Sequence, residues 1–249
     1  AETDAGDITD SGTLIASGVA SFTTTTANSD IDSGGLAVTG AIDVHTNGAT
    51  GNATLVNTIA VNLAASDVGG DLDVTATTGS ITQAGALTVA GASTFNTIVS
   101  GSNIILDQNS YFAGAVTLQA NSGNGTFGNI TFVDRGGVNL AANAAAAGNL
   151  FIDAVTDGAV GGNLSVTAGG NITLETISST GTVTLIADKA ILDGNGDTNN
   201  ITAVSLVTTS VDGFGRGDTI ETVLDASFNF TDTGTLGIQL INSSNGILK

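Results

Sequence analysis

The sequence predicts an all-β protein, and within that class a parallel β-helix (β-solenoid) of about 12 coils of roughly 20 residues each. Composition is the first observation behind this prediction. The β-branched residues Thr, Val and Ile are abundant and favour strands, and 35 glycines supply corners. Only three Glu and two Lys are present, although surface helices depend on these residues.

The absence of proline is the second observation. None occurs in 249 residues, against about 5% in average proteins. Proline cannot donate a hydrogen bond to a strand ladder, so a fold in which most strands are paired on both sides excludes it. The apolar residues point the same way. They make up 41% of the chain, yet aromatics are only 4%, and a core of stacked identical layers needs only medium-sized aliphatics.

A short recurring motif is the third observation. The pattern Gly-x-Φ-x-Φ, with Φ an aliphatic residue or Phe, has the alternation of a short strand with one buried face, and its glycine marks a corner. Alternate copies often lie about 19 to 22 residues apart, which suggests one coil. The motif starts at Gly34, Gly40, Gly70, Gly85, Gly114, Gly128, Gly136, Gly148, Gly162, Gly170, Gly181 and Gly234.

Two copies of the motif are nearly identical. Residues 69–76 and 161–168 agree at six of eight positions and are 92 residues apart. A β-sandwich or jelly roll of antiparallel hairpins is the alternative, because Asn-Gly and Asp-Gly pairs form tight hairpin turns. Such pairs occur at Asn47, Asp157, Asp193, Asp212 and Asn245.

The density of the motif predicts three regions. Residues 34–206 form the β-helix rod, 1–33 form an N-terminal cap or docking segment, and 207–249 form an irregular C-terminal cap or docking segment. Terminal repeats of solenoids are atypical because they cap exposed ladders.

Residues such as Gly162-Asn163-Leu164-Ser165-Val166-Thr167-Ala168-Gly169-Gly170-Asn171-Ile172-Thr173-Leu174 resemble the haemagglutinin-type repeats of large bacterial surface adhesins, the filamentous haemagglutinins among them. The resemblance covers roughly residues 34–206. It implies a right-handed parallel β-helix, export to the bacterial cell surface, and adhesion or matrix formation.

Charge and missing residue types exclude several functions. A net charge of −19 with four Lys and Arg disfavours nucleic acid and anionic membrane surfaces as partners. No apolar run is long enough for a transmembrane helix, so membrane insertion is not expected. Zero Cys and the single His45 leave no triad or zinc site. The pairs Asp30/Asp32 and Asp71/Asp73 are expected to face solvent, so we expect no enzyme.

Two loops carry candidate sites. Asp193, Asn195 and Asp197 have the 1-3-5 spacing of oxygen ligands in calcium loops, although Thr198 and Val204 break the rest of the EF-hand pattern. The alternative is an Asx-rich loop between coils, and no other cofactor is indicated. Arg216, Gly217 and Asp218 form an Arg-Gly-Asp tripeptide in a Gly-rich loop, a candidate for partner binding at a host surface, with a plain loop as the alternative.

The expected function is that of a non-catalytic structural protein. Copies would self-assemble into an extracellular filament, sheath or matrix, because solenoid ends expose unpaired strand edges. The alternative is a stalk segment of a large bacterial adhesin, which spaces a separate binding tip from the cell surface. Carbohydrate or a host surface would be the further partner in either case.

Overall fold

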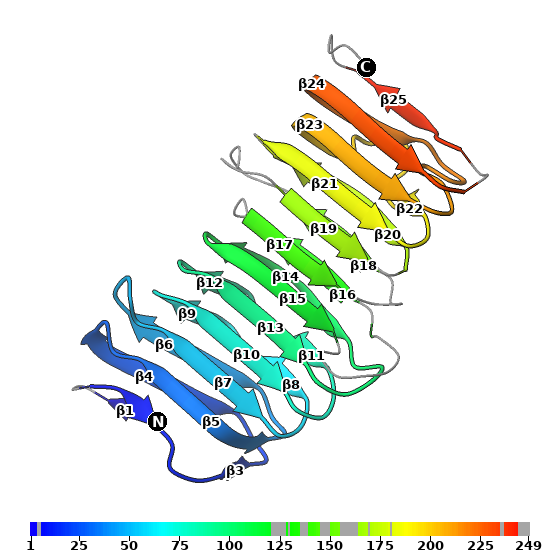
Figure 1. The fold of residues 1–249 in the computed structure, drawn as a ribbon. Coiled ribbons are helices and arrows are strands. Elements are labelled where there is room, and N and C mark those ends of the chain that lie inside the picture. The colour runs from blue at the N-terminus through cyan, green and yellow to red at the C-terminus, as the bar shows by residue number, and fades with distance from the viewer. Residues whose placement is uncertain are drawn as a thin grey trace.

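The chain forms a rod of stacked parallel strands, with the N-terminal strands at one end and the C-terminal strands at the other (Figure 1). This computed structural model describes residues 1–3, 6–120, 128, 130–134, 139–144, 150–154, 164–168, 170–179, 181–234 and 237–243. These residues contain 25 strands and no helix. Every strand pairing among them is parallel, which confirms the β-solenoid and excludes the sandwich of antiparallel hairpins.

The strands fall into two columns, which we call column A and column B; column A strands lie side by side along the rod in Figure 1. Column A contains β2 (Ile8–Thr9), β3 (Leu14–Ala16), β5 (Ile31–Val38), β7 (Ala53–Asn57), β10 (Leu72–Ala76), β13 (Ser93–Thr97), β15 (Ala115–Ala120), β17 (Asn139–Ala144), β19 (Leu164–Ala168), β21 (Thr182–Ala187) and the second halves of β23 (Ile201–Ser210) and β24 (Ile220–Asp232).

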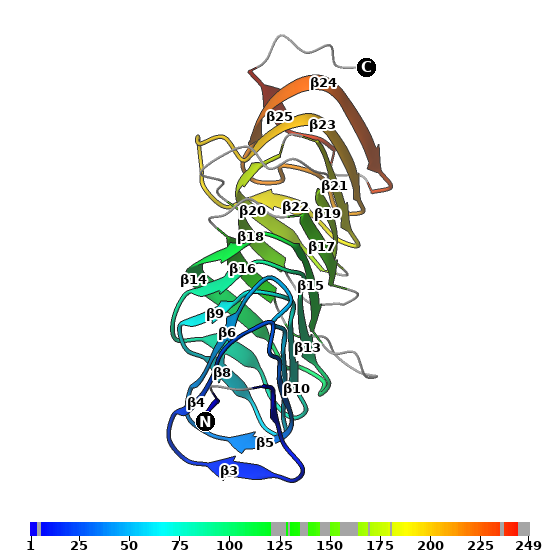
Figure 2. The ribbon, with the colours of Figure 1, turned by 90° about the vertical axis from the view of Figure 1, so that its left-hand side faces the viewer.

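Column B lies across the core from column A, and Figure 2 shows β14 to β20 of column B opposite β13 to β19. It contains β1 (Glu2–Thr3), β4 (Ala20–Ala27), β6 (Ile42–Asn47), β8 (Val61–Leu63), β9 (Ser66–Val68), β11 (Ile81–Gln83), β12 (Leu87–Val89), β14 (Ile104–Phe112), β16 (Ile130–Asp134), β18 (Leu150–Ala154), β20 (Ile172–Ser178), β22 (Ile191–Asp193), the first halves of β23 and β24, and β25 (Leu240–Asn242).

The coil is longer than predicted. Successive column A strands pair at steps of 19 to 24 residues, for example Leu72 with Ser93 and then Ser93 with Val116. The rod therefore has fewer coils than the twelve or so expected. The near copies at 69–76 and 161–168 place Leu72 and Leu164 at the same register position of column A, four coils apart.

The strand ladders run past the predicted limits of the rod. Ile8 already pairs with Ile31, and Ile220 pairs with Leu240, so stacked coils extend on both sides of 34–206. Capping or docking by residues 1–33 and 207–249 stays a prediction about the function of these coils.

Column B holds the most regular part of the core. Equivalent positions of successive coils stack on one another, with Leu150 between Ile130 and Ile172. The others are each at most 2% exposed, and they are Val61, Ile81, Ile104, Ile130, Ile172, Ile191 and Phe214. The phenylalanines gather at two places. Phe112 contacts Phe95 and Phe132 at ring-centre distances of 5.9 and 5.6 Å, and Phe214 packs with Phe228 and Phe230 near the C-terminal end. Stacking identical side chains gives each coil the contacts that it lacks alone.

Most of the described motif glycines are required for space rather than for an unusual backbone angle; they are Gly40, Gly70, Gly85, Gly114, Gly128 and Gly234. Gly34 is an exception, because a Cβ there would meet nothing within 4 Å. None of the described motif glycines has a positive φ. A Cβ on Gly40 would lie 2.1 Å from the carbonyl oxygen of Gly18, and a Cβ on Gly114 would lie 2.2 Å from that of Gly91. Neighbouring coils therefore touch backbone to backbone at these corners. The motif glycines at 136, 148 and 162 lie outside the described residues.

One corner of the rod has a ladder of side-chain oxygens, which we call the corner ladder. The residue before each of the column A strands β2, β5, β7 and β10 accepts a hydrogen bond from the backbone N–H of its equivalent in the next coil. Asp7 Oδ1 accepts from Asp30 at 2.9 Å, Asp30 Oδ1 from Asn52 at 2.8 Å, Asn52 Oδ1 from Asp71 at 2.8 Å, and Asp71 Oδ1 from Ala92 at 2.7 Å. Each coil thus satisfies one backbone donor of its successor.

Candidate functional site

The predicted calcium loop connects β22 to β23 in column B. Asp193 ends β22, and its Oδ1 accepts the backbone N–H of Asn195 at 2.9 Å, which closes an Asx turn. Gly196 follows with a φ of +64°, a conformation that glycine adopts without strain. Asp193 and Asn195 are half-buried, whereas Asp197 is exposed. The structure therefore brings together the first two of the three predicted ligands.

Asn200 is the residue that organises this loop, and the sequence analysis missed it. It is fully buried, and its amide nitrogen lies 2.6 Å from Asp193 Oδ1 and 2.8 Å from Asn195 Oδ1. The same nitrogen lies 3.2 Å from the carbonyl oxygens of Leu174 and Glu175 in the preceding coil. Four acceptor oxygens thus converge on one amide.

The other end of the Asn200 side chain reaches the following coil, because its Oδ1 accepts the backbone N–H of Glu221 at 3.0 Å. Asn57 is a second such residue. Its Oδ1 accepts from the Val38 N–H, and its amide donates to the carbonyls of Val38 and Ala60 at 2.9 and 2.6 Å. A buried asparagine at a bend is therefore a repeated means of joining coils.

These contacts bear on calcium. The oxygens of Asp193 and Asn195 that a cation would need already accept the Asn200 amide, so an ion would have to displace it. Among the described residues no group of three or more His, Asp or Glu side chains is arranged to hold a metal. Calcium binding by Asp193, Asn195 and Asp197 stays a prediction.

Glu221 is an unusual carboxyl beside this loop. Its Oε2 is shielded from solvent and has no hydrogen-bond partner. Burial raises the pKa of Glu221, and the negative charges of Asp193, Asp218 and Asp197 raise it further, while a backbone hydrogen bond opposes them. The sequence around Glu221 shows only Asp218 of these charges, because Asp193 and Asp197 come from the preceding coil.

The Arg-Gly-Asp tripeptide lies in the loop before β24. Arg216, Gly217 and Asp218 are all exposed, and Gly217 has a φ of +92°. Asp218 Oδ1 accepts the backbone N–H of Thr219 at 2.9 Å, which fixes its side chain against the loop. The tripeptide is thus presented to solvent, and partner binding through it stays a prediction.

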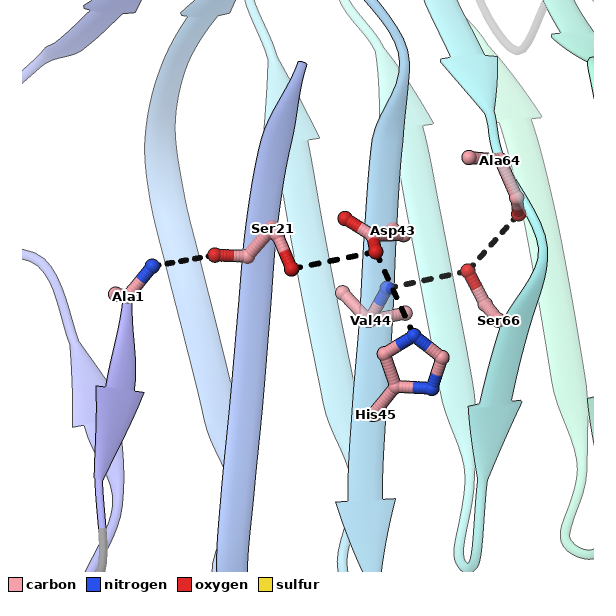
Figure 3. Close-up of polar contacts among 7 residues, drawn as sticks. All are labelled: Ala1, Ser21, Asp43, Val44, His45, Ala64 and Ser66. Atoms are coloured by element: carbon pink, nitrogen blue, oxygen red, sulfur yellow. Dashed lines mark hydrogen bonds and ion pairs between the residues drawn. The ribbon is translucent and has the colours of Figure 1, made fainter.

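His45 lies inside β6, and its side chain is 41% exposed. Its Nε2 lies 3.5 Å from Asp43 Oδ2, which also accepts the Ser21 hydroxyl at 3.2 Å (Figure 3). Figure 3 shows the neighbouring contacts as well: the Ala1 amino group donates to the Ser21 carbonyl, and the Ser66 hydroxyl accepts the Val44 N–H at 3.1 Å. The group joins neighbouring column B strands.

The aspartate pairs Asp30/Asp32 and Asp71/Asp73 contain residues that face solvent and residues that join coils. Asp32, Asp71 and Asp73 are exposed, as expected. Asp30 is half-buried, and with Asp71 it belongs to the corner ladder, where each carboxylate accepts a backbone N–H. The sequence showed the alternation, but it did not show that these carboxylates join coils, because this requires the register of the next coil.

The fold and these contacts define a repeat β-solenoid protein whose polar side chains mainly connect one coil to the next. Residues 50–119, which span β7 to β15, match a family described as repeats of unknown function (DUF5649). No curated protein and no solved structure matches the chain. The described residues contain no helix long and apolar enough to cross a membrane.

Proposed function

We propose that this chain is a non-catalytic structural subunit whose copies join end to end into an extracellular filament, sheath or matrix. The observation that carries the proposal is the open strand ladder at each end of the described stack. β3 contacts β5 on one side, and β25 contacts β24 on one side, so each leaves an unpaired edge in the described part of the chain. Such edges are templates for adding another strand.

Apolar side chains accompany both edges. At the N-terminal end Leu14, Ile15 and Val19 are 42, 79 and 69% exposed, and Leu14 and Val19 line a cavity of about 250 Å³ with Phe22. At the C-terminal end Ile238 and Ile241 are 47 and 54% exposed. Joining the two ends would bury these side chains and continue the ladders, as each coil does for its neighbour.

The second candidate is a stalk segment of a large bacterial surface adhesin. The observation that favours it is the match of residues 50–119 to a repeat family, together with the resemblance to haemagglutinin-type repeats. A stalk needs only length and stiffness, and the same solenoid supplies both.

Electron microscopy of the purified chain tests the proposal. The column A strands form eleven layers, because β2 and β3 both pair with β5, and eleven layers at about 4.8 Å predict a subunit repeat of about 50 Å. Filaments with that repeat support end-to-end assembly, and they should shorten when Ile15 and Val19 are both replaced by Lys. The control is Val99→Lys, because Val99 is also exposed, at 41%, but lies on the side of the rod. Isolated short rods at every concentration favour the stalk.

A further inference from the structure

We infer that the column A face from β13 to β24 is the surface on which a second copy of this chain packs side by side. The starting observation is how charge is distributed. The chain has a net charge of −19, but the two outward register positions of these column A strands carry no charged residue. We call this surface the neutral face.

The neutral face is built from outward side chains that alternate with the core. On β13, β15 and β21 they are half-buried, and they are Thr94, Asn96, Thr117, Gln119, Thr184 and Ile186. The pairing keeps them in two rows, since Thr94 lies opposite Thr117, and Asn96 lies opposite Gln119. On β23, Val207 and Thr209 continue the rows, because they pair with Thr184 and Ile186.

Charge returns where the neutral face ends. Asp73 on β10 pairs directly with Thr94, and Asp32 occupies the same register position two coils earlier. Column B also carries acids at exposed outward positions, for example Asp67 on β9. Two copies with a charge of −19 repel one another, and the neutral face is where their approach costs least.

A second copy also matches this face in spacing. Its rows repeat at the same strand separation of about 4.8 Å, so hydroxyl and amide side chains of one rod can interdigitate with those of the other along the whole contact. Seven strands at that separation, each about five residues wide at about 3.3 Å per residue, bury about 1,100 Å² in total on the two copies. That area passes the minimum of about 1,000 Å² for a biological interface and lies just below the range of about 1,200–2,000 Å² for stable complexes, as suits a lateral contact that is repeated along a filament.

The inference rests on the proposed self-assembly and adds the lateral partner. The experiment places a charge on the face and a matched charge elsewhere. Thr117→Asp with Thr184→Asp adds two carboxylates to the neutral face. Thr88→Asp with Thr202→Asp adds two carboxylates at exposed positions of column B. Circular dichroism and melting confirm that both variants fold.

Sedimentation then measures self-association. We expect the face variant to weaken lateral pairing at least tenfold and the column B variant to change it less than twofold. We also expect wild-type pairing to strengthen from 20 to 500 mM salt, because salt screens the repulsion between the two rods. Equal effects of the two double variants, or a wild-type chain that never pairs laterally, would overturn the inference.

Cysteine cross-linking gives a second readout that does not depend on added charge. The chain has no native Cys, so Thr117→Cys and Thr88→Cys each introduce a single thiol. A short bismaleimide should link Thr117→Cys into dimers and leave Thr88→Cys monomeric. The neutral face would belong to another partner if the wild type bound ice or an insoluble polysaccharide, did not pair laterally, and lost that binding only in the face variant. That result would overturn the inference.

Microscopy separates this inference from the proposed function. Single filaments of the face variant that no longer bundle support the lateral contact and leave end-to-end assembly intact. Bundles that persist unchanged in the face variant refute the lateral contact while the filament proposal stands. Wild-type rods that pair side by side without forming filaments refute end-to-end assembly and support the lateral contact.

Discussion

Replacing Gly114 by Ala tests the principle that coils of this rod touch backbone to backbone. The new Cβ would lie 2.2 Å from the carbonyl oxygen of Gly91, 2.4 Å from its carbonyl carbon and 2.7 Å from the Ala92 nitrogen. Ordinary contacts of a Cβ begin at about 3.4 Å, so the two coils must separate by about 1 Å at this corner. All three atoms are backbone, which no side-chain rotation can move away.

The expected cost follows from overpacking, which destabilises by about 1–3 kcal/mol, and here we expect the upper part of that range. For a chain of this length each kcal/mol lowers the melting temperature by about 2–4 °C. Gly114→Ala should therefore melt about 4–12 °C below the wild type when followed by circular dichroism or calorimetry.

Gly34→Ala is the matched control. Gly34 lies in β5 with no positive φ, and a Cβ there meets nothing within 4 Å. It should melt within about 2 °C of the wild type, because an added methyl group in open space has little effect. If the two variants melt alike, close contact between coils is not the reason for the motif glycines.

Three further predictions concern the loops of column B. Asn200→Ala should lower the free energy of unfolding by about 2–4 kcal/mol in denaturant titration, because several buried groups lose their hydrogen-bond partners. Asn199→Ala should have little effect. Similar unfolding midpoints for the two variants would contradict the role of Asn200. Glu221→Gln should stabilise the chain at neutral pH, because a pKa that is raised in the folded state means that folding disfavours the charged carboxylate. This gain in stability should fade as the pH falls through the folded pKa of Glu221 towards its unfolded pKa. A gain that persists at acid pH would refute this cause. The predicted calcium site requires that calcium displace the Asn200 amide, so millimolar calcium should raise the melting temperature and Asp193→Asn should abolish the rise; an unchanged melting temperature would contradict the calcium site.

Much of the fold is encoded locally and could be predicted. Alternation in stretches such as Leu72–Ala76 requires only that one strand face be buried, and the near-identical stretch at 164–168 indeed occupies the same register position. The length of a coil was harder to predict from the sequence. It depends on loops of varying length between strands, and the motif spacing sampled only some of them.

The features that the sequence did not predict depend on register between coils. The oxygen of Asp30 and the N–H of Asn52 are 22 residues apart, and only the stacking shows that they meet. The same holds for Asn200, whose partners lie in three successive coils. Glycine was predicted at the corners, but the sequence did not show why the motif requires it there. Positions such as Gly40 and Gly114 need room against the backbone of the preceding coil and have no positive φ.

The corner ladder makes the length of the rod adjustable in whole coils. Asn52 and Asp71 each accept a hydrogen bond from the next coil through a side-chain oxygen and donate their backbone N–H to the preceding coil. Either residue can therefore make the same two bonds whichever ladder coil precedes or follows it. Removing residues 71–91 would bring the Asn52 oxygen to the Ala92 N–H and leave the chain of bonds unbroken. Duplicating that segment would lengthen the rod by one strand spacing, about 4.8 Å. A gene for such a protein can therefore change the length of the rod by copying or losing one segment while the corner ladder is kept.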